Sequence, residues 1–190
     1  MREQELYNKY SKDKHWEKHP TLYAESFINF LKKTSFDGSI VDIGCGNGRD
    51  VSRFNKAGFN VLGIDISEEE INDAKKNFPN IKFDIQNVEK LKFKDNSIDA
   101  YFMINVIHYT NKVKALSEIF RTLKKDGYLF IHFNLSIIDE YRKLDYLYEE
   151  SDIIKLVSKF KIINKNIFER IDKKPVKHIH KIMELILQKP

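Results

Sequence analysis

Three glycines alternate with other residues at the end of a short apolar run, in the segment 41–49 (VDIGCGNGR). Glycine is costly inside regular structure, but it adopts positive φ angles easily and lets a ligand contact the main chain. A helix that follows such a turn presents free N–H groups and a partial positive charge. Strand, glycine turn and helix therefore predict a site for an adenosine-containing ligand at the carboxyl edge of a parallel sheet.

The spacing of these glycines separates different kinds of nucleotide site. In the dinucleotide fingerprint G-x-G-x-x-G, counted from Gly44, the third glycine would fall at position 49, which is Arg49. No Gly-Lys-Ser/Thr sequence follows the turn, as a phosphate-binding P-loop would require. The pattern favours a ligand that has an adenosine and an amino-acid tail but no diphosphate.

An acidic residue, Asp65, lies at the end of the second predicted strand, 21 residues after Gly44. A carboxylate at this position can accept hydrogen bonds from a ribose diol. Ser67, followed three residues later by Glu70, forms a capping-box pattern, so Ser67 is expected to cap the next helix. This leaves Asp65 available for the ribose; the alternative is that Asp65 itself caps that helix.

The elements that position these residues can be read from the alternation of apolar runs with helix-period segments. We expect helices over 21–34, 49–57, 67–77 and 113–123, and strands over 39–43, 60–64, 81–85, 98–104 and 128–133. A helix over 151–159, with Ser151 as its N-cap, then precedes two successive strands over 160–168 and 179–187. The pattern predicts an α/β fold in a single domain, 1–190, with a seven-stranded, mostly parallel sheet, a C-terminal antiparallel hairpin and helices on both faces.

Composition limits the partners and the compartment. The 33 Lys and Arg exceed the 28 Asp and Glu only slightly and are spread along the chain, which leaves nucleic-acid binding open but does not favour it. The single cysteine, Cys45, excludes an internal disulfide and fits a reducing compartment. No apolar run approaches the roughly 18 residues of a membrane span, and none follows the N-terminus as in a signal peptide. We therefore expect a cytoplasmic protein with no membrane partner.

Four segments, in this order and spacing, resemble the class I S-adenosylmethionine-dependent methyltransferases, and the resemblance covers about 37–133. They are 41–49 (VDIGCGNGR), 63–67 (GIDIS), 97–101 with 105–109 (SIDAY and NVIHY), and 121–129 (RTLKKDGYL). The resemblance implies a Rossmann-like fold, S-adenosyl-L-methionine as cofactor, and methyl transfer as the activity. The predicted terminal hairpin is similar to the family's sheet, which ends in one antiparallel strand.

The resemblance also implies roles for individual residues. Asp42 and the backbone of Gly44 and Gly46 would face the methionine part of the cofactor, Asp65 would hold the ribose, and Ile66 would pack on the adenine. The remaining cofactor-binding candidates are Arg49, Asn87, Val88, Asn105, Tyr10 and Trp16. Many family members have an acidic residue where Asn87 stands; its amide oxygen can still accept a hydrogen bond from the adenine amino group, but without charge.

The N-terminal segment 1–35 is expected to form a lid over the cofactor and substrate. Its aromatic residues, including Tyr10 and Trp16, stand in an otherwise polar sequence, which indicates that they cover something apolar. The alternative is that the first helix simply packs on the sheet. The lid interpretation is similar to the small tellurite-resistance and thiopurine-type methyltransferases, in which an N-terminal segment closes over the cofactor, and it favours a small acceptor.

His108 is the candidate catalytic base, because it follows the fourth strand at the carboxyl edge of the sheet and imidazole titrates near neutral pH. The alternative is that His108 only shapes the pocket. Methyl transfer from a sulfonium otherwise needs alignment more than acid–base chemistry, so no triad or metal cluster is expected. His178 and His180 alternate in the last strand, but no cysteine lies near them, and a metal site is not favoured.

The function expected from the sequence is therefore transfer of a methyl group to a small-molecule acceptor by in-line displacement. The place after the fourth strand reads Asn105-Val106-Ile107-His108 and lacks the Asn-Pro-Pro-Tyr signature of amino-group methylation on adenine or glutamine. Two alternatives stay open: a tRNA or protein methyltransferase, and a non-catalytic S-adenosylmethionine-binding regulator or partner protein.

Overall fold

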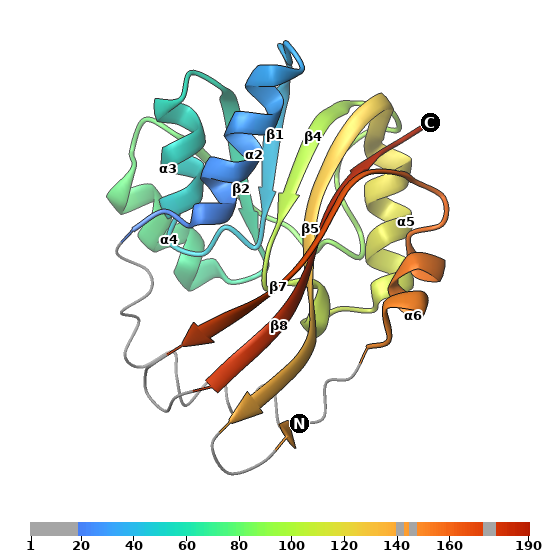
Figure 1. Ribbon diagram of the computed structural model, residues 1–190. Helices are drawn as coiled ribbons and strands as arrows, with labels where there is room; N and C mark the ends of the chain where they lie inside the picture. Colours follow the sequence, from blue (N-terminus) through green and yellow to red (C-terminus); the bar gives the residue numbers. More distant parts are fainter. Residues whose placement is uncertain (1–18, 140–142, 145–147, 173–177) are drawn as a thin grey trace. The chain divides into compact units, whose positions relative to one another are not determined.

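The computed structural model describes residues 19–139, 143–144, 148–172 and 178–190 (Figure 1). The chain divides into two compact units, residues 1–85 and 86–190. The prediction of a single domain over 1–190 remains a prediction. Within the described parts of the chain, no helix is both long enough and apolar enough to cross a bilayer.

The described part of the first unit holds three parallel strands in the order β3-β2-β1. These strands are β1 (Ser39–Ile43), β2 (Asn60–Asp65) and β3 (Lys82–Ile85), close to the ranges predicted. Their register aligns Asp42 with Gly63 and Gly63 with Phe83. Because each strand begins and ends near its neighbours' ends, the glycine turn after β1 and the acidic end of β2 meet at one edge of this unit.

Three helices accompany these strands: α2 (Leu22–Lys33), α3 (Arg49–Lys56) and α4 (Glu68–Asn77). Thr21 caps α2, since its hydroxyl accepts the Ala24 N–H at 3.2 Å. Helix α2 packs against α3 (Figure 1). Between them, the Phe27 and Phe54 rings meet edge to face with centroids 6.3 Å apart. The first helix is thus fixed by an aromatic core contact and not by the sheet alone.

The second unit contains the strand order β4-β5-β8-β7. Strand β4 (Ile98–Met103) runs parallel to β5 (Leu123–Asp139), whereas β8 (His178–Gln188) is antiparallel to both β5 and β7 (Lys161–Asp172). The short β6 (Lys143–Leu144) pairs with the end of β5. The predicted C-terminal antiparallel hairpin is confirmed (Figure 1).

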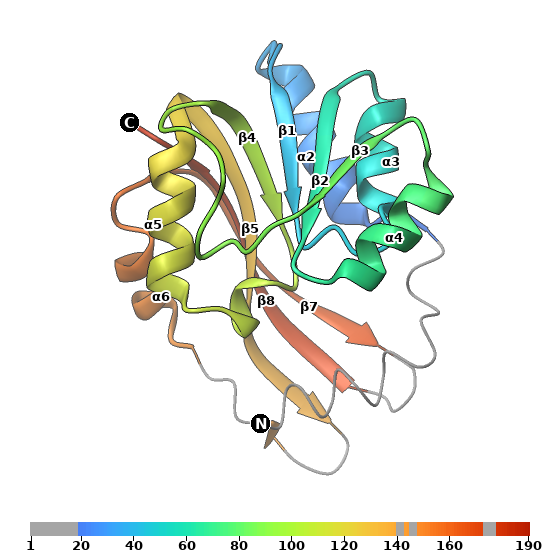
Figure 2. The same ribbon diagram turned by 180° about the vertical axis from the view of Figure 1, so that it is seen from behind.

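The helices of the second unit are the 3₁₀ turn η2 (Ile107–Tyr109), α5 (Lys112–Thr122) and α6 (Glu150–Leu156). Helices α5 and α6 lie side by side in both views (Figure 2). The Phe120 ring of α5 meets the Phe160 ring, which follows α6, edge to face at 5.1 Å. Asn111 caps α5 through its side-chain oxygen, which accepts the Lys114 N–H at 3.1 Å.

Two predicted elements differ from the observed ones. The strand expected over 128–133 is β5, which spans 17 residues, because its pairing with β8 continues from Tyr128 to Asp139. The prediction that Ser151 caps the next helix was wrong. The N-cap is Glu149, whose carbonyl oxygen accepts the Asp152 N–H at 3.0 Å, so Ser151 already lies inside α6.

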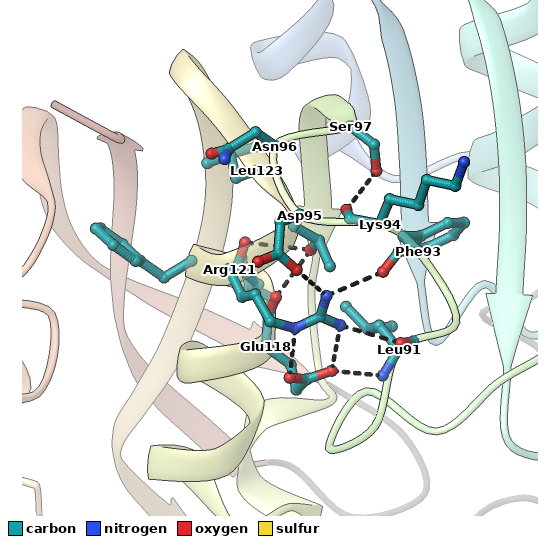
Figure 3. Close-up of polar contacts among 12 residues, drawn as sticks. Leu91, Phe93, Lys94, Asp95, Asn96, Ser97, Glu118, Arg121 and Leu123 are labelled. Carbon is teal, nitrogen blue, oxygen red and sulfur yellow. Dashed lines mark hydrogen bonds and ion pairs between the residues drawn. The ribbon is translucent and has the colours of Figure 1, made fainter.

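One arginine holds the segment before β4 against α5. The Arg121 guanidinium donates to the carbonyl oxygens of Leu91 (3.1 Å) and Phe93 (3.0 Å) and to both carboxylate oxygens of Glu118 at 2.8 Å (Figure 3). It also bonds the Asp95 carboxylate at 2.6 Å. A planar guanidinium suits this role because its five N–H donors lie in fixed directions. The loop that carries Asn87 and Val88 is therefore anchored at its far end.

Candidate functional site

The glycine turn is bound to the end of β2 through its backbone. The N–H groups of Gly44 and Cys45 both donate to the Ile64 carbonyl oxygen, at 2.8 and 3.1 Å. Gly44, Gly46 and Gly48 all have positive φ angles, of 71°, 51° and 85°. The turn therefore needs glycine at these positions, as its sequence predicted.

The Phe83 ring of β3 packs closely against the backbone of the turn and of β2. A Cβ atom on Gly48 would lie 2.8 Å from this ring, and one on Gly63 would lie 2.6 Å from it. Both glycines thus allow the ring to approach the main chain closely. Sequence reasoning missed Phe83 and Gly63, although a glycine inside a strand is a known signal of such an approach.

Asp65 is oriented by two backbone donors. One of its carboxylate oxygens accepts the Gly46 N–H at 3.0 Å, and the other accepts the Ser67 N–H at 2.9 Å. The predicted cap is confirmed, since the Ser67 hydroxyl accepts the Glu70 N–H at 3.3 Å. A carboxylate has about four acceptor positions, so two remain for hydroxyl donors. The neighbouring Ile66 side chain is 69% exposed, as a surface for a flat ring would be.

Carboxylates gather around the glycine turn. Asp42 is buried, and burial raises its pKa well above the ordinary value; the nearby Asp50 and Asp65 raise it further, while Arg49 lowers it. Asp50 is buried as well, and its carboxylate accepts the N–H of Thr21 at 2.6 Å and the Thr21 hydroxyl at 3.1 Å. Sequence reasoning missed this link between α3 and the residue before α2. Burial also raises the pKa of Asp50. A cationic ligand beside these two buried carboxylates would favour their charged forms.

These residues fit the cofactor that the sequence predicts. S-adenosylmethionine carries a sulfonium and an ammonium, both positive, together with a ribose diol and an adenine. The first unit offers acidic groups, an oriented carboxylate with free acceptor positions, and an exposed aliphatic side chain. Of the predicted residues, the first unit brings together Asp42, Gly44, Gly46, Arg49, Asp65 and Ile66.

The other predicted cofactor residues lie elsewhere. Asn87 uses its side-chain oxygen to accept the Glu89 N–H at 2.8 Å, and Val88 is buried in the second unit. Asn105 adopts a positive φ of 56°, and its N–H donates to His132 Nε2 at 2.9 Å. Tyr10 and Trp16 lie outside the described residues, as does most of the predicted lid.

His108, the candidate base, is held by a backbone donor. Its Nε2 accepts the N–H of Asn134 on β5 at 3.2 Å. Burial, followed by the nearby Lys112 and His180, lowers the pKa of His108 to about 4. Its Nδ1 is buried and has no hydrogen-bond partner among the described residues; the same holds for the side-chain oxygen of Asn134.

Two further polar residues accompany His108 inside the second unit. His132 and Asn134 stand at alternate positions of β5 and are 0% and 9% exposed. Sequence reasoning missed them, although two polar residues in the otherwise apolar run 129–135 were a visible signal. In a buried strand such side chains need partners. His132 has one in the segment that follows β4, where the Asn105 N–H donates to its Nε2, whereas Asn134 contacts this segment only through its backbone N–H.

Known proteins share this architecture. A family model described as a methyltransferase domain matches residues 41–131. The chain is 35% identical, over 113 residues, to a ubiquinone/menaquinone biosynthesis C-methyltransferase of Campylobacter jejuni, which covers 54% of this chain and 46% of that protein. It is 34% identical over 158 residues to the uncharacterised protein MJ1123 of Methanocaldococcus jannaschii, covering 82% of this chain and 70% of the relative. The match to this chain thus spans about half the length of the Campylobacter protein.

A solved structure shows the fold. The crystal structure of an S-adenosylmethionine-dependent methyltransferase from Methanosarcina mazei matches with a TM-score of 0.69 and 22% identity, over 80% of this chain and 92% of that one. The predicted Rossmann-like, mostly parallel sheet with its antiparallel C-terminal pair is confirmed. Fold and glycine turn together define a nucleoside-binding α/β protein. The family model carries the assignment further for residues 41–131: this part of the chain is a methyltransferase domain, similar to the S-adenosylmethionine-dependent methyltransferases. The cofactor of this family, S-adenosyl-L-methionine, is the one predicted.

Proposed function

We propose that this chain transfers a methyl group from S-adenosylmethionine to a small-molecule acceptor. The observation that carries the small acceptor is a pair of buried polar atoms, His108 Nδ1 in η2 and the Asn134 side-chain oxygen on β5, which lack partners among the described residues. Buried polar atoms are nearly always paired, so a small ligand that supplies the missing partners fits this position. A nucleic acid would instead contact an exposed basic surface.

The donor is assigned to the first unit. Asp65 would bind the ribose hydroxyls through its two remaining acceptor positions, and Asp42 would act on the positive methionine part. Arg49 and the Gly44 and Gly46 backbone would complete this half, with Ile66 against the adenine. Asn87, Val88, Asn105, Tyr10 and Trp16 keep the roles that the resemblance implies, as proposals.

The cofactor supplies an activated methyl group, so the chain's own residues need mainly to orient the acceptor and exclude water. His108 can do so as a hydrogen-bond donor. A backbone N–H cannot accept, so the contact with Asn134 requires the lone pair on His108 Nε2 and places the proton of the neutral ring on Nδ1. The lowered pKa keeps the ring neutral. The geometry therefore supports the donor role of His108 better than the role of base.

The acceptor class is drawn from the relatives and the polar interior of the second unit. The Campylobacter relative is named for C-methylation in ubiquinone and menaquinone biosynthesis. A small ring that carries oxygen substituents fits both that name and the donors of His108 and its neighbours. We expect the reaction to take place in the cytoplasm.

The direct test is the release of S-adenosylhomocysteine in the presence of separate acceptor classes. We expect turnover with small molecules, among them hydroquinones, carboxylates, thiols and amines, and none with tRNA or an unfolded protein. An Asp65→Asn variant should lose the activity in every arm. Turnover confined to tRNA or protein would contradict the proposal, and cofactor binding without turnover in any arm would indicate a regulatory protein.

A further inference from the structure

Strand β7 forms an edge of the second unit's sheet. It is antiparallel to β8 on one side, and no other strand of the described residues pairs with its opposite side (Figure 1). Six successive residues at its start, 161–166, are exposed, as are Glu169 and Ile171. The N–H and C=O groups along such an edge can form hydrogen bonds with a strand of another chain.

This edge is longer and more regular than the edges of most soluble monomers, which are shortened, bulged or protected by charge. Strand β7 has 12 residues, and its register with β8 shifts only between Ile162 and Asn164. The part that follows Asn164 is regular. Its one lysine, Lys165, forms an ion pair with Glu150 of α6, so its charge protects the edge less than a free lysine would.

Symmetry limits how two copies of this strand can pair. A continuous antiparallel sheet built from two identical strands needs a two-fold axis perpendicular to the sheet, and such an axis keeps every side chain on its own side. Opposed residues share a side, while neighbours along a strand alternate between the two sides. One residue must therefore lie opposite its own copy, and the allowed registers differ by slides of two residues.

One of these registers matches the charges of β7. With Ile167 opposite Ile167 of a second copy, Lys165 lies opposite Glu169 on both sides of the axis. Sliding the copy by two residues would instead place Lys165 opposite Ile167 or Ile171. Sliding it by four residues would place Lys165 or Glu169 opposite its own copy, and like charges directly opposite each other are destabilising.

The opposite side of the sheet is compatible with the same register. There Asn164 lies opposite Arg170 of the second copy, and Asn166 lies opposite Phe168. No like charges therefore meet between residues 164 and 170. The strand is self-complementary over these seven residues.

We propose that β7 is an interaction surface for a second copy of this chain, which pairs with it antiparallel and two-fold symmetric, with Ile167 at the axis. The pairing adds main-chain hydrogen bonds, two ion pairs between Lys165 and Glu169, and a contact between the two Ile167 side chains. It joins the strands β4-β5-β8-β7 of two chains into one sheet. The inference does not depend on the proposed function, because no residue of β7 is assigned to the donor or to His108.

Crosslinking of the full chain tests the register. A bismaleimide with a short spacer should join two Ile167→Cys chains, because opposed residues have Cβ atoms about 5 Å apart. Ile171→Cys is the matched control: it lies four residues from the axis, so the distance to its own copy is about 26 Å. The native Cys45 is buried, and the unmodified chain measures its contribution. No covalent dimer of Ile167→Cys, or equal crosslinking of Ile171→Cys, would overturn the proposal.

Charge variants test the contacts, by sedimentation velocity. The unmodified chain should form a dimer at micromolar concentration. Glu169→Lys and Lys165→Glu each turn two attractive pairs into repulsive ones and should raise the dissociation constant at least about tenfold, whereas Lys75→Glu, an exposed position on α4, should not change it.

An equimolar mixture of Glu169→Lys and Lys165→Glu separates a lost contact from a lost fold. In a mixed pair every lysine lies opposite a glutamate, so the two variants should form a heterodimer although neither dimerises alone. A monomeric unmodified chain, or a mixture that stays monomeric, would overturn the proposal.

Discussion

The glycine turn of the first unit and the histidines His108 and His132 of the second are polar regions of opposite character. Around the turn, burial and neighbouring carboxylates raise the pKa of Asp42. Around the two histidines, burial lowers the pKa values of His108 and His132, and neighbouring basic side chains lower them further. A methyltransferase combines a cationic donor with an electron-rich acceptor, and in the proposed function the first region binds the donor.

The largest effect should come from the backbone of the turn. Gly48→Ala places a Cβ atom 2.8 Å from Phe83 at a φ of 85°, and we expect the free energy of unfolding to fall by roughly 3 kcal/mol. Gly58→Ala is the matched control, since its φ is 95° but nothing lies within 4 Å of the new atom. It should cost about 1 kcal/mol. Equal losses in urea unfolding would show that the Phe83 contact is unimportant.

The next effect concerns the oriented carboxylate. Asp65→Asn replaces a charged acceptor by an amide whose NH₂ group would face a backbone donor, and we expect the affinity for S-adenosylmethionine to fall by about 100-fold. Asp73→Asn on the outer side of α4 serves as the control and should bind normally. Calorimetry measures both. If the affinity for S-adenosylmethionine fell by less than threefold in Asp65→Asn, the carboxylate of Asp65 would not bind the ribose.

His108 makes stability depend on pH in one direction. Its pKa is about 4 in the folded chain and about 6.5 when exposed, so the unfolded state binds more protons between these values. Stability is therefore complete above pH 6.5 and is lost as the pH falls towards 4. Relative to His108→Gln, which can still accept the Asn134 N–H, the unmodified chain should lose about 2 kcal/mol over this range. If the unmodified chain and His108→Gln lost the same free energy of unfolding between the two pH values, the lowered pKa of His108 would be contradicted.

Asp42 should make the free energy of unfolding depend on pH in the opposite direction, and by a smaller amount. Its raised pKa means that the folded state holds a proton that the unfolded state releases, so stability is lost as the pH rises above the ordinary carboxyl range. Asp42→Asn should therefore gain stability relative to the unmodified chain as the pH rises, by about 1 kcal/mol or a few degrees in Tm. Asp37→Asn, an exposed position, should show no such trend. A gain that shrinks with pH would reverse the assigned sign.

The first region could be predicted from the sequence because its determinants are local. Gly44 to Arg49 and Asp65 to Ser67 are short segments whose turn and capping preferences act within a few residues. Phe83 was missed because its contact with Gly63 depends on the register of two strands. The carboxylate of Glu70 was also missed; it reaches the turn, 3.6 Å from the position of a Cβ on Gly46.

The second region could be predicted only in part. His108 was found because a motif marks the segment after β4. His132, His180 and Arg170 come from strands whose pairing joins residues far apart in the chain, and no local pattern aligns them. The role as a base expected for His108 stays a prediction; the donor role that we propose rests on the Asn134 N–H, a contact that the sequence did not reveal.

We expect the glycine turn to bind a methyl donor and no dinucleotide. Calorimetric titration of the full chain with S-adenosylmethionine and, separately, with nicotinamide adenine dinucleotide tests it most directly. We predict saturable binding of one S-adenosylmethionine per chain and no heat from the dinucleotide at the same concentration. Absence of S-adenosylmethionine binding at millimolar concentration, or equal binding of the dinucleotide, would contradict the account.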